Sequence, residues 1–210
     1  MKYLGKPAGM WALFAGSFEK HLTVEFDLTA GQAKDVAARA KKKYREIIAK
    51  LPEFDKRDRF EMNIVNCAML AAFILCMPQR PDIKTLTDYY AAAMMTPTMK
   101  AFCRASGKKK FTPKDIEGMK ATAKLRAGDR NPYSWSMDFF EYEDGSGYEA
   151  RFTTCGICTL MQVLGLYDLT PALCHLDYTM SDAGGASDFV REYTLASGGP
   201  YCDCGYHKKQ

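Results

Sequence analysis

Apolar side chains in the first 127 residues recur at every third or fourth position, which is the spacing of an amphipathic helix. The clearest such segment lies between Thr29 and Pro52. Thr29 and Gln32 make a capping-box pair at its start, and Pro52 ends it. Its apolar face consists of Ala33, Val36, Ala40, Tyr44, Ile47, Ile48 and Leu51.

The rest of this first part also has helical spacing. Pro97 either kinks a helix or separates it from a segment that runs through Ala105. Thr112 caps a later helix, with Pro113 at its first position. The remaining helices are expected over residues 9–20, 58–76 and 83–95.

Near residue 133 the period of the apolar positions changes to two, which is typical of half-buried strands. Trp135, Met137 and Phe139 alternate with polar residues, and residues 143–147 have the composition of a hairpin turn. Strands are expected near residues 134–142, 148–154, 188–196 and 201–207, and helices over residues 156–164 and 170–182.

These elements predict an α+β fold, in which a helical N-terminal portion packs on a small, mainly antiparallel sheet with two short helices inserted between strands. We expect a single domain over residues 1–210. A soft internal boundary is expected near residues 128–133, between the helical residues 1–127 and the mixed residues 133–210, which carry the candidate site.

Composition and charge narrow the class of protein. The net charge of +4 is mild, and we expect the lysine runs at residues 41–43 and 108–110 to be solvated faces. Residues 64–77 form the longest apolar stretch, which is too short to span a bilayer. No secretory signal pattern is present, so we expect a cytoplasmic protein with reduced thiols and with no nucleic-acid or membrane partner. The sequence does not determine the oligomeric state.

Reactive side chains concentrate in the last third of the chain, which contains five of the eight cysteines. Cys155 is predicted at a strand-to-helix junction and Cys174 in the first turn of the next helix. Both positions favour the thiolate, because the positive end of a helix dipole lowers a thiol pKa. Asp177 follows Cys174 by three residues, so the two share a helix face. The alternative is that these cysteines are small buried apolar residues.

Arg191 is the second notable side chain, because it shares the strand parity of Phe189 and Tyr193. An inward-facing arginine needs an anionic partner. That partner is either the carboxylate of a substrate or a structural ion pair with Asp177 or Asp203.

The segment after Arg191 has two interpretations. Gly198 and Gly199 permit either close backbone approach to a ligand or a plain hairpin turn. Thr194 has the opposite strand parity, so it joins Arg191 in one pocket only if the strand bulges or twists.

Zinc is a competing interpretation of the cysteines. Cys155 and Cys158 form a Cys-x-x-Cys pair, but Cys202 and Cys204 form only Cys-x-Cys, with Cys174, His175 and His207 nearby. A zinc ribbon usually pairs two Cys-x-x-Cys knuckles, so no metal or other cofactor is expected and zinc stays a minority alternative. A redox dithiol at Cys155 and Cys158 is not expected, because no thioredoxin-like order of strand and helix surrounds it.

The order and gaps of residues in the last 55 positions resemble the L-2-amino-thiazoline-4-carboxylic acid hydrolase family. The sequence departs from the family pattern in three places. Gly156 and Ile157 follow Cys155 where many relatives have proline and an aromatic residue, Cys204 replaces an aromatic residue, and Cys158 is an addition. The residues that carry the resemblance are Cys155, Gly165, Leu166, Asp168, Leu169, Pro171, Cys174, Asp177, Arg191, Thr194, Gly198, Gly199, Cys202 and Asp203.

The resemblance implies hydrolytic opening of a small thiazoline ring at its C=N carbon, in a substrate that bears a carboxylate. Either a thiolate of Cys155 or Cys174 attacks that carbon, or Asp177 or Asp203 deprotonates a water. The catalytic set it implies is Cys155, Cys174, Asp177, Cys202 and Asp203. The substrate-binding set is Arg191, Thr194, Gly198 and Gly199. A non-catalytic sensor domain and a zinc-stabilised interaction module are the alternatives from other classes.

Overall fold

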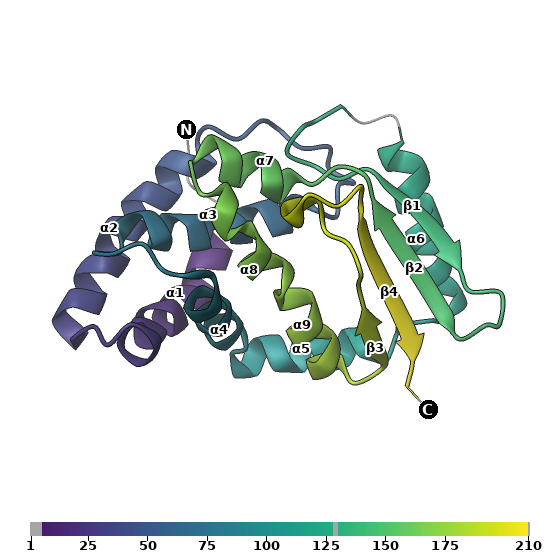
Figure 1. Ribbon diagram of the computed structural model, residues 1–210, viewed down its shortest axis with the longest axis horizontal. Coiled ribbons are helices and arrows are strands. Elements are labelled where there is room, and N and C mark those ends of the chain that lie inside the picture. Colours follow the sequence, from purple (N-terminus) through teal and green to yellow (C-terminus); the bar gives the residue numbers. More distant parts are fainter. Residues whose placement is uncertain (1–5, 128–129, 210) are drawn as a thin grey trace.

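The computed structural model describes residues 6–127 and 130–209, and Figure 1 shows how their elements are arranged. The helical part packs around α3, whose residues are apolar on most sides and mostly buried. Phe73 of α3 lies against Trp11 and Phe18 of α1. The helices of this part are α1 (Lys6–Glu25), α2 (Ala30–Ile48), α3 (Glu61–Cys76), α4 (Ile83–Met94), α5 (Pro97–Gly107) and α6 (Pro113–Arg126).

Four strands form an antiparallel sheet in the order β1-β2-β4-β3. One face packs on α6 through Met119 and Ala123, which contact a small apolar cluster centred on Met137 and Ala150. The hairpin between the first two strands turns at Gly145, whose φ of 70° favours glycine. The strands are β1 (Met137–Glu141), β2 (Gly147–Phe152), β3 (Ser187–Val190) and β4 (Cys202–Lys208).

Short helices fill the space between the sheet and the α1–α4 group (Figure 1). α7 packs on α3, α8 on α4, and α9 on α5 and β3. A 3-10 turn, η1, precedes α8, and a second one, η2, precedes β4. These elements are α7 (Gly156–Val163), η1 (Tyr167–Leu169), α8 (Thr170–Cys174), α9 (Leu176–Gly184) and η2 (Leu195–Ser197).

A buried ion pair between Arg126 and Asp58 connects the segment that leads into the sheet with the helical part. Arg126 is 1% exposed and lies with its Nη1 2.9 Å from Oδ2 of Asp58, which is 4% exposed. Ser134 donates to the same oxygen at 2.6 Å, and the backbone N–H of Phe60 donates to the other oxygen. The network ties the end of α6, the start of α3 and the entry to β1 together.

The predicted α+β class is confirmed, and the sheet contains no segment of residues 30–76. The expected boundary near residues 128–133 includes residues 128 and 129, which lie outside the described residues. The strand predicted over residues 188–196 is wrong after Val190. The carboxylate of Asp203 accepts the backbone N–H groups of Glu192 and Tyr193, so these groups cannot continue a β-ladder.

Lys110, in the second lysine run, is not fully solvated, contrary to the prediction from the sequence. Lys108 and Lys109 are exposed, but Lys110 is partly buried and its Nζ lies 3.3 Å from the ring centroid of Tyr206. Burial lowers the pKa of Lys110 to about 8. The alkyl stem and ammonium group of Lys110 therefore cover the aromatic side of the sheet.

The longest apolar stretch, residues 64–77, is predicted from the sequence to be too short to span a bilayer. In the part of the chain that the structure describes, no helix combines the length and the apolar character needed to cross a bilayer.

Candidate functional site

The register of the sheet brings the cysteines of the last third toward one another. Phe152 at the end of β2 pairs with Cys202 at the start of β4. Cys155 follows Phe152 by three residues and is the N-cap of α7. The start of α7 therefore lies beside the start of β4, although the two segments are far apart in the sequence.

Gly156 makes this placement possible. A Cβ on Gly156 would come within 2.1 Å of the carbonyl oxygen of Tyr133, so a larger residue would push the start of α7 off the chain that leads into β1. The close approach also sets Cys155 beside Trp135, two residues further along that chain.

Cys155 has the environment of a thiolate. Its pKa is lowered, first by hydrogen bonding from the Cys158 thiol, then by the backbone N–H groups of Cys158 and Ile157 and by the indole of Trp135. The Cys155 side chain makes no regular N-cap hydrogen bond. The lowered pKa therefore comes from several donors around one sulfur. These donors outweigh burial, which by itself would raise the pKa. The sequence-based prediction of an activated thiol at this helix start agrees with this direction.

Cys158 has the opposite tendency. Its pKa is raised well above the ordinary range, mainly because it donates to Cys155 and secondly because it is buried. Charges on Cys155, Cys174 and Cys202 also raise it. We call Cys155, Cys158, Cys174 and Cys202 the thiol cluster, because the other three all influence the titration of Cys158.

Cys174 does not lie where the sequence placed it. The helical run begins before α8, at η1, so Cys174 is the last residue of α8 rather than in a first turn. Burial raises its pKa well above the usual thiol value, and a charge on Cys155 adds to this. The prediction that a helix dipole favours the Cys174 thiolate is therefore wrong.

Cys202 and Cys204 are both buried on one face of β4. Burial raises the pKa of Cys202, although the backbone N–H of Leu195 donates to its sulfur at 3.1 Å. Burial also raises the pKa of Cys204 to about 12. Of the five cysteines in the last third, Cys155 alone has a lowered pKa.

Arg191 is held by partners within the chain. Its Nη2 lies 2.5 Å from Oδ2 of Asp177 and 2.9 Å from the sulfur of Cys204. Its Nη1 donates to the carbonyl oxygen of Cys174 at 2.9 Å. The side chain of Arg191 is 5% exposed and that of Asp177 is 45% exposed. Of the two kinds of partner that the sequence left open, the structure has the ion pair with Asp177.

Asp203 lies on the other face of β4 from Cys202 and Cys204, as the alternation of a strand requires. Its two carboxylate oxygens accept the backbone N–H groups of Glu192 and Tyr193 at 2.8 and 2.6 Å. The structure therefore places Asp203 apart from the thiol cluster and engages it in holding the loop after β3.

Thr194, Gly198 and Gly199 shape the η2 turn. The hydroxyl of Thr194 accepts the backbone N–H of Ser197 at 3.1 Å. Gly198 ends the turn at a φ of 82°, and a Cβ on Gly199 would come within 2.9 Å of the Thr194 carbonyl oxygen. The hydroxyl of Tyr167 donates to the Leu195 carbonyl oxygen at 3.0 Å, which ties this turn to η1 beside Cys158. These contacts favour the turn interpretation of the glycines.

Residues from the helical part lie beneath the site. A charge on Cys155 or Cys174 raises the pKa of Cys67 on α3, after burial as the main cause. Asn66 donates to the hydroxyl of Tyr90 at 2.8 Å, while its buried Oδ1 has no partner. Burial raises the pKa of Tyr90, and charges on Cys67 and Asp177 add to this. The sequence pattern gave no sign that Asn66 and Cys67 lie beneath the site or that Trp135 faces Cys155.

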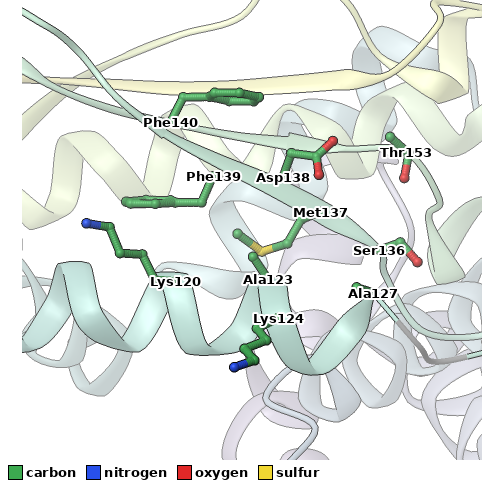
Figure 2. A pocket seen from close by; sticks show the side chains of 10 residues that line it. All are labelled: Lys120, Ala123, Lys124, Ala127, Ser136, Met137, Asp138, Phe139, Phe140 and Thr153. Carbon is green, nitrogen blue, oxygen red and sulfur yellow. The ribbon is translucent and has the colours of Figure 1, made fainter.

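A surface hollow of about 630 Å³ lies elsewhere, between α6 and β1 (Figure 2). Phe139 points toward α6, and Phe140 points to the other side of the strand (Figure 2). Lys120 and Lys124 line the helix side, and Lys120 pairs with Glu141 at 2.5 Å. None of the cysteines lines this hollow, so we place the candidate site at the thiol cluster.

The zinc alternative has no support from the geometry. Among residues 6–127 and 130–209, no three side chains of histidine, cysteine, aspartate or glutamate are arranged so as to hold a metal ion.

Comparison with known proteins places the sequence in context. The model of a family described as L-2-amino-thiazoline-4-carboxylic acid hydrolase matches residues 62–206. This range begins in α3 and includes the thiol cluster, Asp177 and Arg191. No curated protein and no solved structure matches the chain significantly.

Proposed function

Because the chain belongs to the L-2-amino-thiazoline-4-carboxylic acid hydrolase family, we propose that it is a hydrolase that opens a small thiazoline or related cyclic C–N substrate bearing a carboxylate. The observation that supports this most strongly is the thiolate environment of Cys155. A sulfur whose pKa is lowered inside a partly covered site is a nucleophile suited to the electron-poor carbon of a cyclic amidine.

The reaction proceeds in two displacements. The Cys155 thiolate attacks the C=N carbon of the ring, and the ring sulfur leaves as a thiol after it gains a proton. Water then attacks the same carbon and displaces Cys155, which leaves a carbamoyl product. Each step exchanges one carbon–sulfur bond for another bond to the same carbon, so the thiol cluster lies close to every bond that changes.

The protonated cysteines are hydrogen-bond donors to the leaving sulfur. The raised pKa values of Cys158 and Cys174 mean that both keep their protons at neutral pH. Cys174 lies within electrostatic reach of Cys155 from the α8 side, and Cys158 from within α7. A proton on either residue opposes the build-up of negative charge on the departing sulfur.

Asp177 orients the substrate or the water. Its Oδ2 is fixed by Arg191, while the carboxylate is about half exposed and can accept an N–H group or a water from the site. Arg191 acts through Asp177 as a positioning residue. A substrate carboxylate reaches the Arg191 fork only by displacing Asp177, because Nη1 and Nη2 are engaged within the chain and the unpartnered Nε is buried.

Steady-state turnover of thiazoline carboxylates tests the proposal. We expect the wild-type chain to open 2-amino-thiazoline-4-carboxylate or a close cyclic analogue. We expect Cys155→Ser to lose activity by roughly 10³-fold or more, the scale of losing a nucleophile. Cys103→Ser is the matched control, since Cys103 is a buried thiol on α5 whose titration none of the other cysteines influences. Equal turnover by wild type and Cys155→Ser contradicts the covalent route.

A further inference from the structure

Cys155 and Cys158 occupy the N-cap and the third helical position of α7. Side chains at these two positions meet over the first turn of a helix, as the two partners of a capping box do. Here both side chains are thiols, and Cys158 serves as donor toward Cys155. The two sulfurs are therefore neighbours without any rearrangement of the backbone.

The two thiols differ in pKa, and this difference gives them different roles in disulfide exchange. Cys155 is the more readily ionised and is the attacking sulfur. Cys158 keeps its proton until Cys155 loses its charge. An attacking thiolate at a helix N-terminus with a protonated neighbour three residues later is the arrangement that resolves a mixed disulfide within one chain.

Access separates this pair from most other cysteines. Cys155, Cys158 and Cys174 are partly exposed, whereas Cys67, Cys76, Cys103, Cys202 and Cys204 are buried. Cys174 differs from the pair because its thiol lies at the end of α8, where burial opposes ionisation. The α7 pair therefore combines partial exposure with one activated thiol.

Contrary to the expectation from the order of strands and helices, we propose that Cys155 and Cys158 form a redox-active dithiol that a small-molecule disulfide oxidises to an intramolecular disulfide. The Cys155 thiolate attacks one sulfur of the reagent, so a mixed disulfide forms and one thiolate leaves. The Cys158 sulfur then attacks the Cys155 sulfur, the second thiolate leaves, and the proton of Cys158 passes to a released thiolate. The reagent disulfide is reduced to two thiols, and the protein dithiol is oxidised to one disulfide.

Oxidised glutathione is the probe. The folded wild-type chain is incubated with it, remaining thiols are alkylated, and chymotryptic peptides are identified by mass spectrometry. Cleavage after Phe152 and Leu160 yields residues 153–160, which contain Cys155 and Cys158 and no other cysteine. We expect this peptide to lose two hydrogen atoms, to take up no alkyl group, and to regain two alkylatable thiols after dithiothreitol.

Three variants make the result specific. In Cys158→Ser, glutathione is expected to remain attached to Cys155, because no neighbour resolves the mixed disulfide. In Cys155→Ser, residues 153–160 are expected to remain unmodified. Cys103→Ser is expected to oxidise as the wild type does.

Two unreacted thiols in residues 153–160 of the wild type would overturn the proposal, as would a disulfide that joins Cys155 to Cys174 or Cys202. The readout is a mass and not turnover, so it stands or fails independently of the hydrolase activity. If the proposed hydrolase function also holds, oxidation removes the nucleophile and dithiothreitol restores turnover.

Discussion

Arg191 donates to the carboxylate of Asp177 at 2.5 Å, although one side chain is buried and the other is about half exposed. The pair joins the end of β3 to α9 across the base of the thiol cluster. Arg191 also bonds to the Cys174 carbonyl oxygen and to the Cys204 sulfur, and its guanidinium carbon lies 4.7 Å from the ring centroid of Phe189. The site is therefore braced by an ion pair between residues of the chain itself.

Arg191→Lys should destabilise the fold. An ammonium group keeps the charge but cannot reach three acceptors at once, so we expect a loss of about 2–4 kcal/mol in the free energy of unfolding. Urea denaturation measures it. Arg57→Lys is the control: its pair with Asp55 is exposed, so this change should barely alter the free energy of unfolding. An unchanged stability together with lost substrate affinity would instead make Arg191 a substrate anchor.

The alternation of side chains was sufficient to predict the sheet, but not where β3 ends. Phe189 is buried as its parity predicts, yet the ladder stops at Val190 because Asp203 takes the next two backbone N–H groups. A contact from a carboxylate farther along the chain cannot be predicted from the spacing of apolar residues within the strand. Thr194 therefore forms a turn with Ser197 instead of joining a strand.

The candidate site was likewise predictable only in part. A cysteine at a strand-to-helix junction is a local signal, and Cys155 is the N-cap of α7. The donors around it depend on tertiary packing, because Trp135 reaches the sulfur from another segment. Cys174 was misplaced because η1 starts the helical run earlier than Thr170 and Pro171 suggest.

Removing one partner of the buried Asp58–Arg126 pair should be costly. Arg126→Met leaves the Asp58 carboxylate buried without its cation, and we expect a loss of about 3–5 kcal/mol in unfolding free energy. The double variant Asp58→Asn with Arg126→Met should lose less than the two single variants added together, since no charge is left behind. Urea unfolding of the three variants checks this, and strict additivity would contradict it.

The lowered pKa of Lys110 should make the stability of the fold depend on pH. Its folded pKa of about 8 lies below the unfolded value, so the unfolded chain binds more protons between pH 8 and about 10.5. The stability of the wild type relative to Lys110→Met should therefore rise across this window, by at most about 3 kcal/mol, because the aromatic rings offset part of the burial cost. Lys109→Met, at an exposed lysine, should give a flat difference. A flat difference for Lys110→Met as well would refute the burial effect.

The reactivity of Cys155 should depend on Cys158. Iodoacetamide should alkylate Cys155 with a pH midpoint below the ordinary thiol pKa, because only the thiolate reacts. Cys158→Ala removes the largest stabilising donor, so the midpoint should move upward. Alkylation of residues 153–160, followed by mass spectrometry across a pH series, measures both midpoints. An identical midpoint in the two proteins would show that the neighbouring thiol does not activate Cys155.

The central claim is that Cys155 is the nucleophile of a thiazoline-opening hydrolase. The most direct measurement is rapid acid quenching of the wild-type chain during turnover of 2-amino-thiazoline-4-carboxylate, followed by mass spectrometry of residues 153–160. We expect a substrate-derived adduct on the Cys155 sulfur that forms and disappears with turnover, and no adduct in Cys155→Ser. Turnover by the wild type without any adduct, together with undiminished turnover by Cys155→Ser, would contradict it.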